Sequence, residues 1–321
     1  MIVQSIAASD IDSVEFTLSP ALSLLMKVLI AFILFGVALD SRPSDFRNVL
    51  RRPIALAATL GTQYVLMPAV TLGVIAIMNP NPTVALGILF VACCPSGTLS
   101  NLFTHRSHGN VTMSVSLTTV SSALCVVLTP LSFALWGGMS SDVSALLEDI
   151  QISISDMLVE VGIMIAVPFA LGMLVARRYP GFALAARKPV DIATLVVLLM
   201  IAVGGFAGQA SALITGLSAV LGVVLVQNVL SLSIGYGVAR ACRLPVADAR
   251  AVAFESGVRN SALSLALVLM YFEGFGGAAL AAAYWGIVDT ITGLALAEVW
   301  RRRPLSKRQA ADDGVPTAVT S

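Results

Sequence analysis

The sequence carries little charge for its length. Only 12% of its 321 residues are charged, whereas a soluble domain carries about 25%. Hydrophobic residues make up 57% of the chain. This composition predicts an all-α polytopic membrane protein with no soluble domain of useful size outside its apolar segments. We expect the lipid bilayer as its surroundings, and nothing indicates nucleic acid or an obligate protein partner.

Histidine and cysteine are also scarce. Both histidines, His105 and His108, lie in one short loop, and the cysteines show neither metal-binding spacing nor a disulfide framework. The cysteines are Cys93, Cys94, Cys125 and Cys242. No His or Lys lies at membrane depth beside Ser100 to activate it as a nucleophile. We therefore predict neither a cofactor nor an enzyme.

Long hydrophobic segments dominate the rest of the chain. A helix needs about 20 predominantly apolar residues to cross a bilayer. Nine segments qualify, and we number them as spans 1 to 9: 20–39, 53–78, 83–104, 111–136, 155–176, 189–209, 213–239, 246–272 and 277–300. Spans 3 and 8 are interrupted by polar runs that contain proline or glycine.

Positive charge is absent from every second connection. With the N-terminus outside, all Lys and Arg residues fall at the inner side except Lys27 and Arg259, which lie within spans. The outer connections carry acids instead. The positive-inside rule therefore predicts nine spans, with the N-terminus out and the C-terminus in. Residues 1–19, acidic and without Lys or Arg, are expected to form an outer tail rather than a signal peptide, and 304–321 a disordered cytoplasmic tail.

The two interrupted spans resemble each other. One contains Ser96–Asn101 (SGTLSN) and the other Glu255–Ser261 (ESGVRNS). Pro95 removes a backbone donor and Gly97 loosens the chain, so a helix cannot continue through the first run. Spans 3 and 8 run in opposite directions, which is typical of an inverted-repeat carrier with its site at the midplane. We predict that the two breaks together form a binding site, with spans 1–4 and 5–9 as the repeats.

Glu255 is the most informative polar residue at membrane depth. Even lenient insertion scales assign about 3 kcal/mol to an acid at the centre of a membrane helix, and such residues usually mark an ion site or a pathway. The alternative is a structural ion pair with Arg259, four residues further on. Both interpretations stand at this point, and they are compatible.

Hydroxyl and amide side chains accompany the first break. They are Ser100, Asn101, Ser114 and Thr118, and the last two share a helix face because they are four residues apart. Such oxygens suit a hard cation such as Na⁺. The alternative is that they bond to their own backbone or to neighbouring helices.

Three further polar residues lie within spans. Gln63 suits a hydrogen bond between helices, and Lys27 can extend towards the outer surface. Asp289 is a second intramembrane acid, with no neighbouring cation in the sequence. Their roles stay open at this point.

Several of these motifs together resemble the bile acid:sodium symporter family, in the right order and spacing over about residues 30–300. They are Cys93–Asn101 (CCPSGTLSN), Gly109–Val111, Ser114–Ser121 (SVSLTTVS), Gly36–Leu39 with Arg42–Phe46, Gln63–Pro68, and Glu255–Leu263. The resemblance implies a core domain of spans 2–4 and 7–9, a panel domain of spans 1, 5 and 6, and broken spans 3 and 8 that cross at their centres.

The resemblance also implies a function. The protein would be a sodium-coupled symporter of the inner cell membrane that imports a small organic anion, bile-acid-like or a small carboxylate, by alternating access. A proton-coupled or uncoupled carrier of the same fold is the alternative. The substrate itself is not readable from these motifs.

By motif position, the resemblance implies three sets of site residues. A first Na⁺ site would use Ser100, Asn101, Ser114, Thr118 and Glu255. A second would use Gln63, Glu255, the backbone carbonyls of Ser256 and Val258, and the side chain at position 259. The substrate would lie near Thr98, Asn260, Ser261, Asp289 and Thr290.

The chain departs from the family pattern at three positions. Ser96 replaces a glycine in the first break, and Arg259 replaces a glutamine in the second. A guanidinium has only donors and cannot coordinate a cation. We therefore expect Arg259 to act as a built-in cation in the second site; the alternative is that it binds the carboxylate of the substrate. An acid at Asp289 would repel an anionic substrate unless it is protonated or paired.

Overall fold

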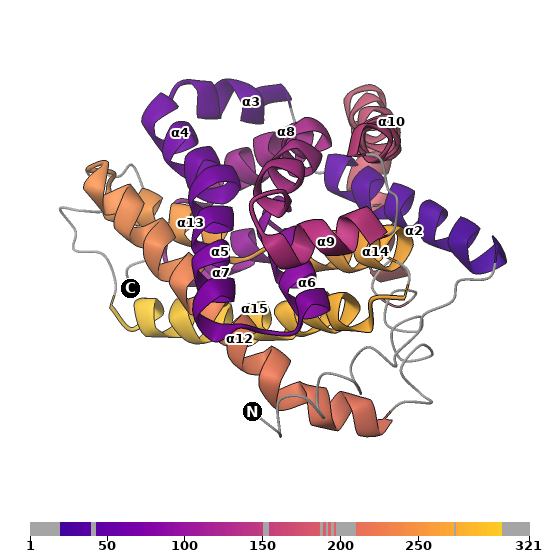
Figure 1. Cartoon of the computed structure of the whole chain (residues 1–321). Coiled ribbons are helices and arrows are strands. Elements are labelled where there is room, and N and C mark those ends of the chain that lie inside the picture. The colour runs from indigo at the N-terminus through magenta and orange to yellow at the C-terminus, as the bar shows by residue number, and fades with distance from the viewer. Residues whose placement is uncertain are drawn as a thin grey trace.

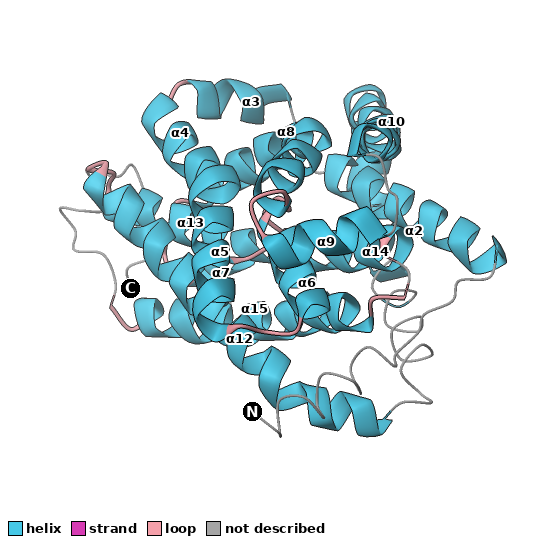
Figure 2. Ribbon diagram, in the orientation of Figure 1, coloured by secondary structure: helices cyan, strands magenta, loops and turns pink. Residues whose placement is uncertain are grey.

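The chain folds as helices joined by short connections, and no strand occurs in the part drawn in colour in Figure 2. The computed structural model describes residues 20–39, 43–149, 154–186, 189–190, 192–193, 196, 210–272 and 274–303. The elements are α2 (Pro20–Leu39), α3 (Pro43–Leu50), α4 (Pro53–Gly61), the π-helical turn η1 (Thr62–Leu66), α5 (Met67–Met78), α6 (Pro82–Ala92), α7 (Leu99–Arg106), α8 (Val111–Gly137), α9 (Ser141–Asp149), α10 (Ile154–Arg178), α12 (Ala210–Ala241), α13 (Val246–Gly257), α14 (Ser261–Tyr271) and α15 (Gly276–Arg301).

These helices coincide with the predicted hydrophobic segments. The breaks predicted in 83–104 and 246–272 are both present, between α6 and α7 and between α13 and α14. The predicted span 189–209 and both predicted tails lie almost entirely or entirely outside the described residues. The short helices α3 and α9 occupy polar connections, and the hydrophobic pattern did not predict them.

Among the described residues, four helical stretches are long and apolar enough to cross a membrane. They are Pro53–Met78, Val111–Gly137, Val220–Ala241 and Gly276–Arg301, and shorter apolar helices accompany them. Their outer surfaces are apolar as well: Ile77 is 86% exposed, and Val127 and Ile291 are more than half exposed. Such surfaces suit lipid rather than water. The chain is therefore an integral membrane protein.

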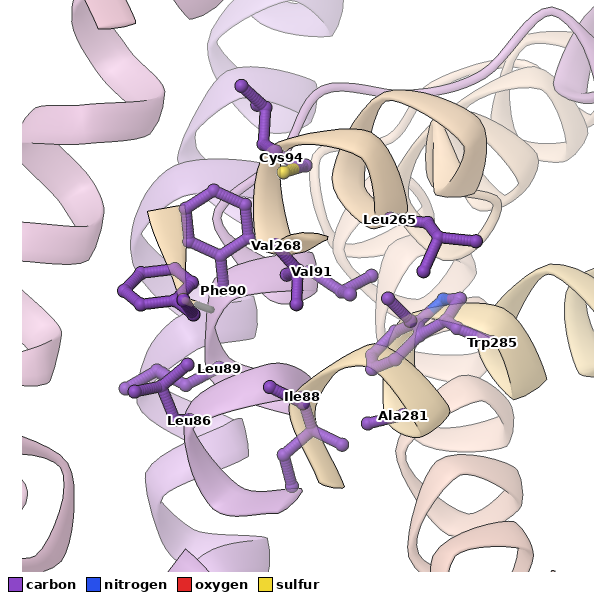
Figure 3. Packing of buried hydrophobic residues seen from close by; sticks show 14 of the residues in the cluster. Leu86, Ile88, Leu89, Phe90, Val91, Cys94, Leu265, Val268, Ala281 and Trp285 are labelled. Carbon is purple, nitrogen blue, oxygen red and sulfur yellow. The ribbon is translucent and has the colours of Figure 1, made fainter. Parts of the chain in front are cut away.

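Helix α6 lies at the centre of the apolar interior. Every residue from Thr83 to Ala92 is buried, as expected of a helix that is hydrophobic on all sides. Its side chains belong to the same apolar cluster as those of α14 and α15, from which Figure 3 shows Leu265, Val268, Ala281 and Trp285. A methyl group added at Gly87 would lie 2.6 Å from the Cα of Ala278. The two helices therefore touch through their backbones, as small residues permit in membranes.

Helices α2 and α10 pack against each other at one side of the molecule, away from α13 and α12 (Figure 1). Helix α12 lies against α13 and α15. Along the chain, the first break is followed by α7 and α8, and the second break by α14 and α15. Both breaks lie inside the assembly of helices, where buried backbone must find partners.

The two breaks satisfy each other's backbone. The N–H of Gly97 donates to the carbonyl of Val258 at 3.2 Å, and the N–H of Asn260 donates to the carbonyl of Pro95 at 2.9 Å. These bonds form an isolated antiparallel bridge between Ser96 and Arg259. Groups that an interrupted helix leaves free are thus paired without water. Gly97 permits this approach, since an added methyl group would lie 2.8 Å from the carbonyl oxygen of Arg259.

We predict that Gly97→Ala lowers the stability of the protein by about 1–3 kcal/mol, because the added methyl group overpacks the contact between the breaks. Thermal unfolding of the detergent-purified protein measures this. Gly73→Ala is the matched control, because Gly73 lies within α5 and an added methyl group meets nothing within 4 Å. Equal melting temperatures for Gly97→Ala and the wild type would contradict the tight contact.

Candidate functional site

The carboxylate of Glu255 lies at the end of α13 and accepts four hydroxyl groups. Its Oε1 accepts from Ser100 Oγ at 2.6 Å, Ser114 Oγ at 2.6 Å and Thr118 Oγ1 at 2.8 Å. Its Oε2 accepts from Ser96 Oγ at 2.5 Å. The Glu255 side chain is 0% exposed. A fully buried acid is thus surrounded by short polar side chains.

Four separate pieces of the chain supply this arrangement. Glu255 ends one broken helix, Ser96 lies within the other break, and Ser100 lies in the first turn of α7. Ser114 and Thr118 lie on one face of α8, as their spacing predicted. Asn101 completes the predicted group, since its Oδ1 accepts from Thr118 Oγ1 at 3.2 Å.

The structure brings the five predicted residues of the first site together, and it adds Ser96. The sequence interpretation treated Ser96 as part of the break, and no spacing rule connects it with an acid 159 residues further along the chain. The alternative of an ion pair between Glu255 and Arg259 is not what the described residues show, since no salt bridge joins these two side chains.

The hydroxyl groups around Glu255 have a second set of acceptors. Ser100 Oγ lies 2.7 Å from the carbonyl of Gly97, and Thr118 Oγ1 lies 3.0 Å from the carbonyl of Ser114. A hydroxyl has one hydrogen and two lone pairs. It can therefore direct its hydrogen to the backbone and a lone pair to a cation beside the carboxylate. Carboxylate, hydroxyl and amide oxygens are the ligands that hard cations take.

Gln63 connects η1 with the same region. Its Nε2 donates to the backbone carbonyl of Glu255 at 2.6 Å, and its Oε1 accepts from Ser121 Oγ at 2.7 Å. Gln63 therefore joins two helices, as one interpretation expected, and it also lies beside the backbone predicted for a second cation site. Single π-helical turns occur frequently at functional sites.

Arg259 is buried in the second break, with 2% of its surface exposed. Its Nη1 donates to the carbonyl of Cys94 at 3.0 Å. Its Nε and Nη2 have no hydrogen-bond partner among the described residues. The guanidinium forms no hydrogen bond with Gln63, Ser256 or Val258 in this part of the chain. The Oγ of Ser256 is likewise buried without a partner there, and the carbonyl of Val258 accepts from Gly97.

Asp289 is held from two sides. Its Oδ2 accepts from the backbone N–H of Arg259 at 2.8 Å, and its Oδ1 accepts from the amide of Asn228. The Oδ1 of Asn228 accepts in turn from Thr292 Oγ1 at 2.5 Å. The sequence-based site did not include Asn228. Gln227 and Asn228 are adjacent amides within a predicted span, and polar side chains at that depth indicate a buried hydrogen bond. Asp289 is 1% exposed.

The other residues predicted for the substrate are more accessible. Thr98 and Thr290 are exposed, and Asn260 and Ser261 are half-buried. Asn260 caps α14 by accepting from the N–H of Leu263 at 3.1 Å. A methyl group added at Gly286 would lie 2.8 Å from Ser261 Oγ, which places the start of α14 next to the turn of α15 before Thr290. Asp289 differs from these four because it is fully enclosed.

We predict that Asn228→Ala lowers the stability by about 1.5–3 kcal/mol, the usual range for a hydrogen bond to a charged group. The substitution leaves the buried carboxyl of Asp289 without its amide donor. Thermal unfolding in detergent gives the measurement. Thr290→Ala serves as the control, since within the described residues the Thr290 hydroxyl bonds to the Gly286 carbonyl of its own helix. A loss no larger for Asn228→Ala than for Thr290→Ala would show that Asp289 does not depend on this amide.

Comparison with known proteins places this sequence in a family. The model of the Sodium Bile acid symporter family matches residues 27–216. The uncharacterized sodium-dependent transporter YocS of Bacillus subtilis (strain 168) is 27% identical over 286 residues, which cover 88% of this chain and 84% of that protein. The human ileal sodium/bile acid cotransporter is 28% identical over 256 residues, which cover 79% and 72% respectively.

A chloroplast protein is similar as well. The probable sodium/metabolite cotransporter BASS1 of Arabidopsis thaliana is 29% identical over 272 residues, which cover 84% of this chain and 65% of that protein. These relatives are named as transporters or cotransporters and not as enzymes. The match of the family model spans more than half of the chain. The protein is therefore a membrane transport protein that belongs to the sodium bile acid symporter family.

Proposed function

We propose that the protein is a secondary active transporter that couples the entry of Na⁺ to the import of a small organic anion. The observation that carries this proposal is the buried carboxylate of Glu255 with four hydroxyl groups around it. The names of the relatives support it, because one is a sodium/bile acid cotransporter and another a probable sodium/metabolite cotransporter.

The proposed architecture has nine spans in the inner cell membrane, with the N-terminus out and the C-terminus in. Spans 2–4 and 7–9 form the core domain and spans 1, 5 and 6 the panel domain. Two inverted repeats place the broken spans 3 and 8 across each other. The mutual hydrogen bonds of the breaks support this arrangement, and so does the distribution of positive charge along the sequence.

The proposed Na⁺ site consists of Glu255 and its oxygen-bearing neighbours. The ligands are Ser100, Asn101, Ser114, Thr118 and Glu255, with Ser96 as a further contact to the carboxylate. When Glu255 and Asp289 are both ionised, they carry two negative charges against the one positive charge of Arg259. One Na⁺ therefore balances the charge of this buried group, and burial of the ion costs least when the group becomes neutral.

Na⁺ binding would order the place where the anion binds. Glu255 lies at the end of α13, before one break, and Ser100 lies in the first turn of α7, directly after the other. An ion between them would therefore hold both breaks in one arrangement, with Ser114 and Thr118 of α8 as further ligands. The proposed anion site lies beside it, at Thr98, Asn260, Ser261, Asp289 and Thr290. The N-termini of α7 and α14 face the breaks and favour negative charge. The two affinities are then linked, and each ligand strengthens the binding of the other. Alternating access would follow from movement of the core domain against the panel domain.

Arg259 sets the proposed ion stoichiometry. Its positive charge is buried in the second break, on the same segment of the chain as Glu255, Ser256 and Val258 of the second cation set. We propose that it replaces a second Na⁺. In the alternative, Arg259 binds the carboxylate of the substrate, and its unpaired Nε and Nη2 support this because they share one edge of the planar guanidinium.

Proton coupling is the second candidate, because two carboxyl groups, Glu255 and Asp289, are buried at the breaks. A proton carried by either acid would replace Na⁺ as the coupling ion. Uptake that follows a pH gradient and ignores Na⁺ would favour this candidate over the first.

We predict that Na⁺ raises the melting temperature of the purified protein more than K⁺ does, and that Ser114→Ala weakens the apparent Na⁺ affinity by about tenfold or more through loss of a ligand (one lost ligand is worth about 1.5–3 kcal/mol). The matched control is Ser116→Ala on the same helix, because the buried Ser116 hydroxyl has no partner in the described structure. Equal Na⁺ affinities for the two variants would remove Ser114 from the site.

We also predict that Glu255→Ala abolishes Na⁺-driven uptake into proteoliposomes. The transported anion is first chosen by a thermal-shift screen of organic anions with and without Na⁺. Uptake in Glu255→Ala that matches the wild type, or wild-type uptake that is indifferent to Na⁺, would contradict the proposed coupling.

For Arg259, we predict that replacement by glutamine restores a second Na⁺ dependence, so that the Hill coefficient for Na⁺ rises. Arg259→Lys keeps the charge and removes the fork of donors. It therefore behaves like the wild type if charge alone matters. If the fork binds the anion, Arg259→Lys instead weakens anion binding while the Hill coefficient stays unchanged.

A further inference from the structure

We propose that Asp248 and Asn110 are positioning residues for the Na⁺ site, although neither lies at it. Their hydrogen bond fixes the helix that carries Glu255 against the helices that carry the hydroxyl ligands. This inference rests on the proposed Na⁺ site and assigns it a support two helical turns away. We call this hydrogen bond the clamp.

Asp248 lies in the first turn of α13, seven residues before Glu255. Seven residues are two helical turns, or about 10 Å. Its Oδ1 accepts from Asn110 Nδ2 at 2.7 Å, and its Oδ2 accepts from Arg52 Nη1 at 2.5 Å. The Asp248 side chain is 3% exposed, whereas that of Arg52 is 48% exposed. Asn110 is half-buried, so its bond is the less exposed of the two, and a hydrogen bond to a carboxylate is stronger where solvent screens it less.

Asn110 also begins the helix that carries two of the ligands. Its Oδ1 accepts from the N–H of Met113 at 3.0 Å and caps α8. Its own N–H donates to the carbonyl of Ala247 at 3.0 Å. Ser114 follows four residues after this cap. One side chain thus sets where α8 starts and how α8 meets α13.

Helix α7, which carries Ser100, also contacts the first turns of α13. The loop 107–110 joins α7, with Ser100, to α8, and the carbonyl of Ser107 accepts from Arg250 Nη1 on α13. Arg250 is buried. Within the loop, the N–H of Gly109 donates to the carbonyl of Thr104 at 2.8 Å. The positions of α7 and α8 therefore both depend on contacts with the first turns of α13.

The clamp matters because the bonds at the site are short. Glu255 meets its hydroxyl partners at 2.5–2.8 Å, and a shift of about 0.5 Å is enough to disturb a preorganised site. Helices transmit a displacement at one end to the other because their backbone is rigid. Partners that orient ligands are typically worth about 10–100-fold in metal affinity.

The test uses Na⁺ alone as the probe, on the purified full chain in detergent, with choline as the reference cation. Asn110→Asp keeps the cap acceptor for Met113 but replaces the Nδ2 donor with an oxygen that faces Asp248. We expect Na⁺ affinity to fall about tenfold. Asp248→Asn retains an acceptor for Asn110, so its effect is smaller. Asn110→Asp combined with Asp248→Asn reverses donor and acceptor, restores the bond, and returns the Na⁺ affinity to within about threefold of the wild type.

Glu298→Gln is the control, because Glu298 also joins α15 to α7 through Arg106 but is partly exposed, and its hydrogen bonds within the described residues go to Arg106, Arg301 and Arg302. It leaves Na⁺ affinity unchanged. The restored affinity in the combined variant separates positioning from a general loss of stability, which the melting temperature without Na⁺ measures independently.

Two results overturn the inference while the Na⁺ site stands. One is wild-type Na⁺ affinity in Asn110→Asp while Ser114→Ala loses it. The other is a combined variant that binds Na⁺ as weakly as Asn110→Asp alone. A wild-type protein that does not distinguish Na⁺ from choline would refute the proposed Na⁺ site itself, and the clamp would then have no ion site to position.

Discussion

A fully buried carboxylate is the constraint on which this structure depends. Glu255 is fully buried, and an isolated carboxylate in an apolar interior costs several kcal/mol. Four hydroxyl groups meet it, from a break and two helices that are far from it in the sequence. Any conformation that separates Glu255 from these hydroxyl groups leaves its carboxylate exposed or buried without hydrogen bonds. The buried acid therefore links the relative position of the two broken helices to its hydrogen bonds with these hydroxyl groups.

The surrounding fold provides what this arrangement needs. Two interrupted helices would each leave backbone groups unpaired, and here the groups of one break bond to those of the other. Close contact requires small residues, hence Gly97 between the breaks and Gly87 between α6 and α15. Apolar packing around α6 holds the ends of the breaks in place. Polar contacts at Asn110 and Asp248 connect the helices beyond the site.

Much of the fold was predictable from the sequence, because lipid requires long apolar helices and tolerates interruptions only inside the protein. The positions of both breaks followed from Pro95, Gly97 and Gly257. The shared face of Ser114 and Thr118 followed from helical spacing. Contacts between distant segments did not follow: the roles of Ser96 and Asn228, and the bond from Arg259 to the Cys94 carbonyl, depend on packing that no local pattern encodes. The helices α3 and α9 were missed because they are short and polar.

The central claim is that Na⁺ binds beside the Glu255 carboxylate. The most direct measurement is the charge displaced by a rapid Na⁺ jump on protein adsorbed to a solid-supported membrane, with no organic anion present. We predict a transient current in the wild type for Na⁺ but not for K⁺, and its disappearance in Glu255→Gln, which keeps the size of the side chain but removes its charge. An undiminished Na⁺ current in Glu255→Gln would contradict the account.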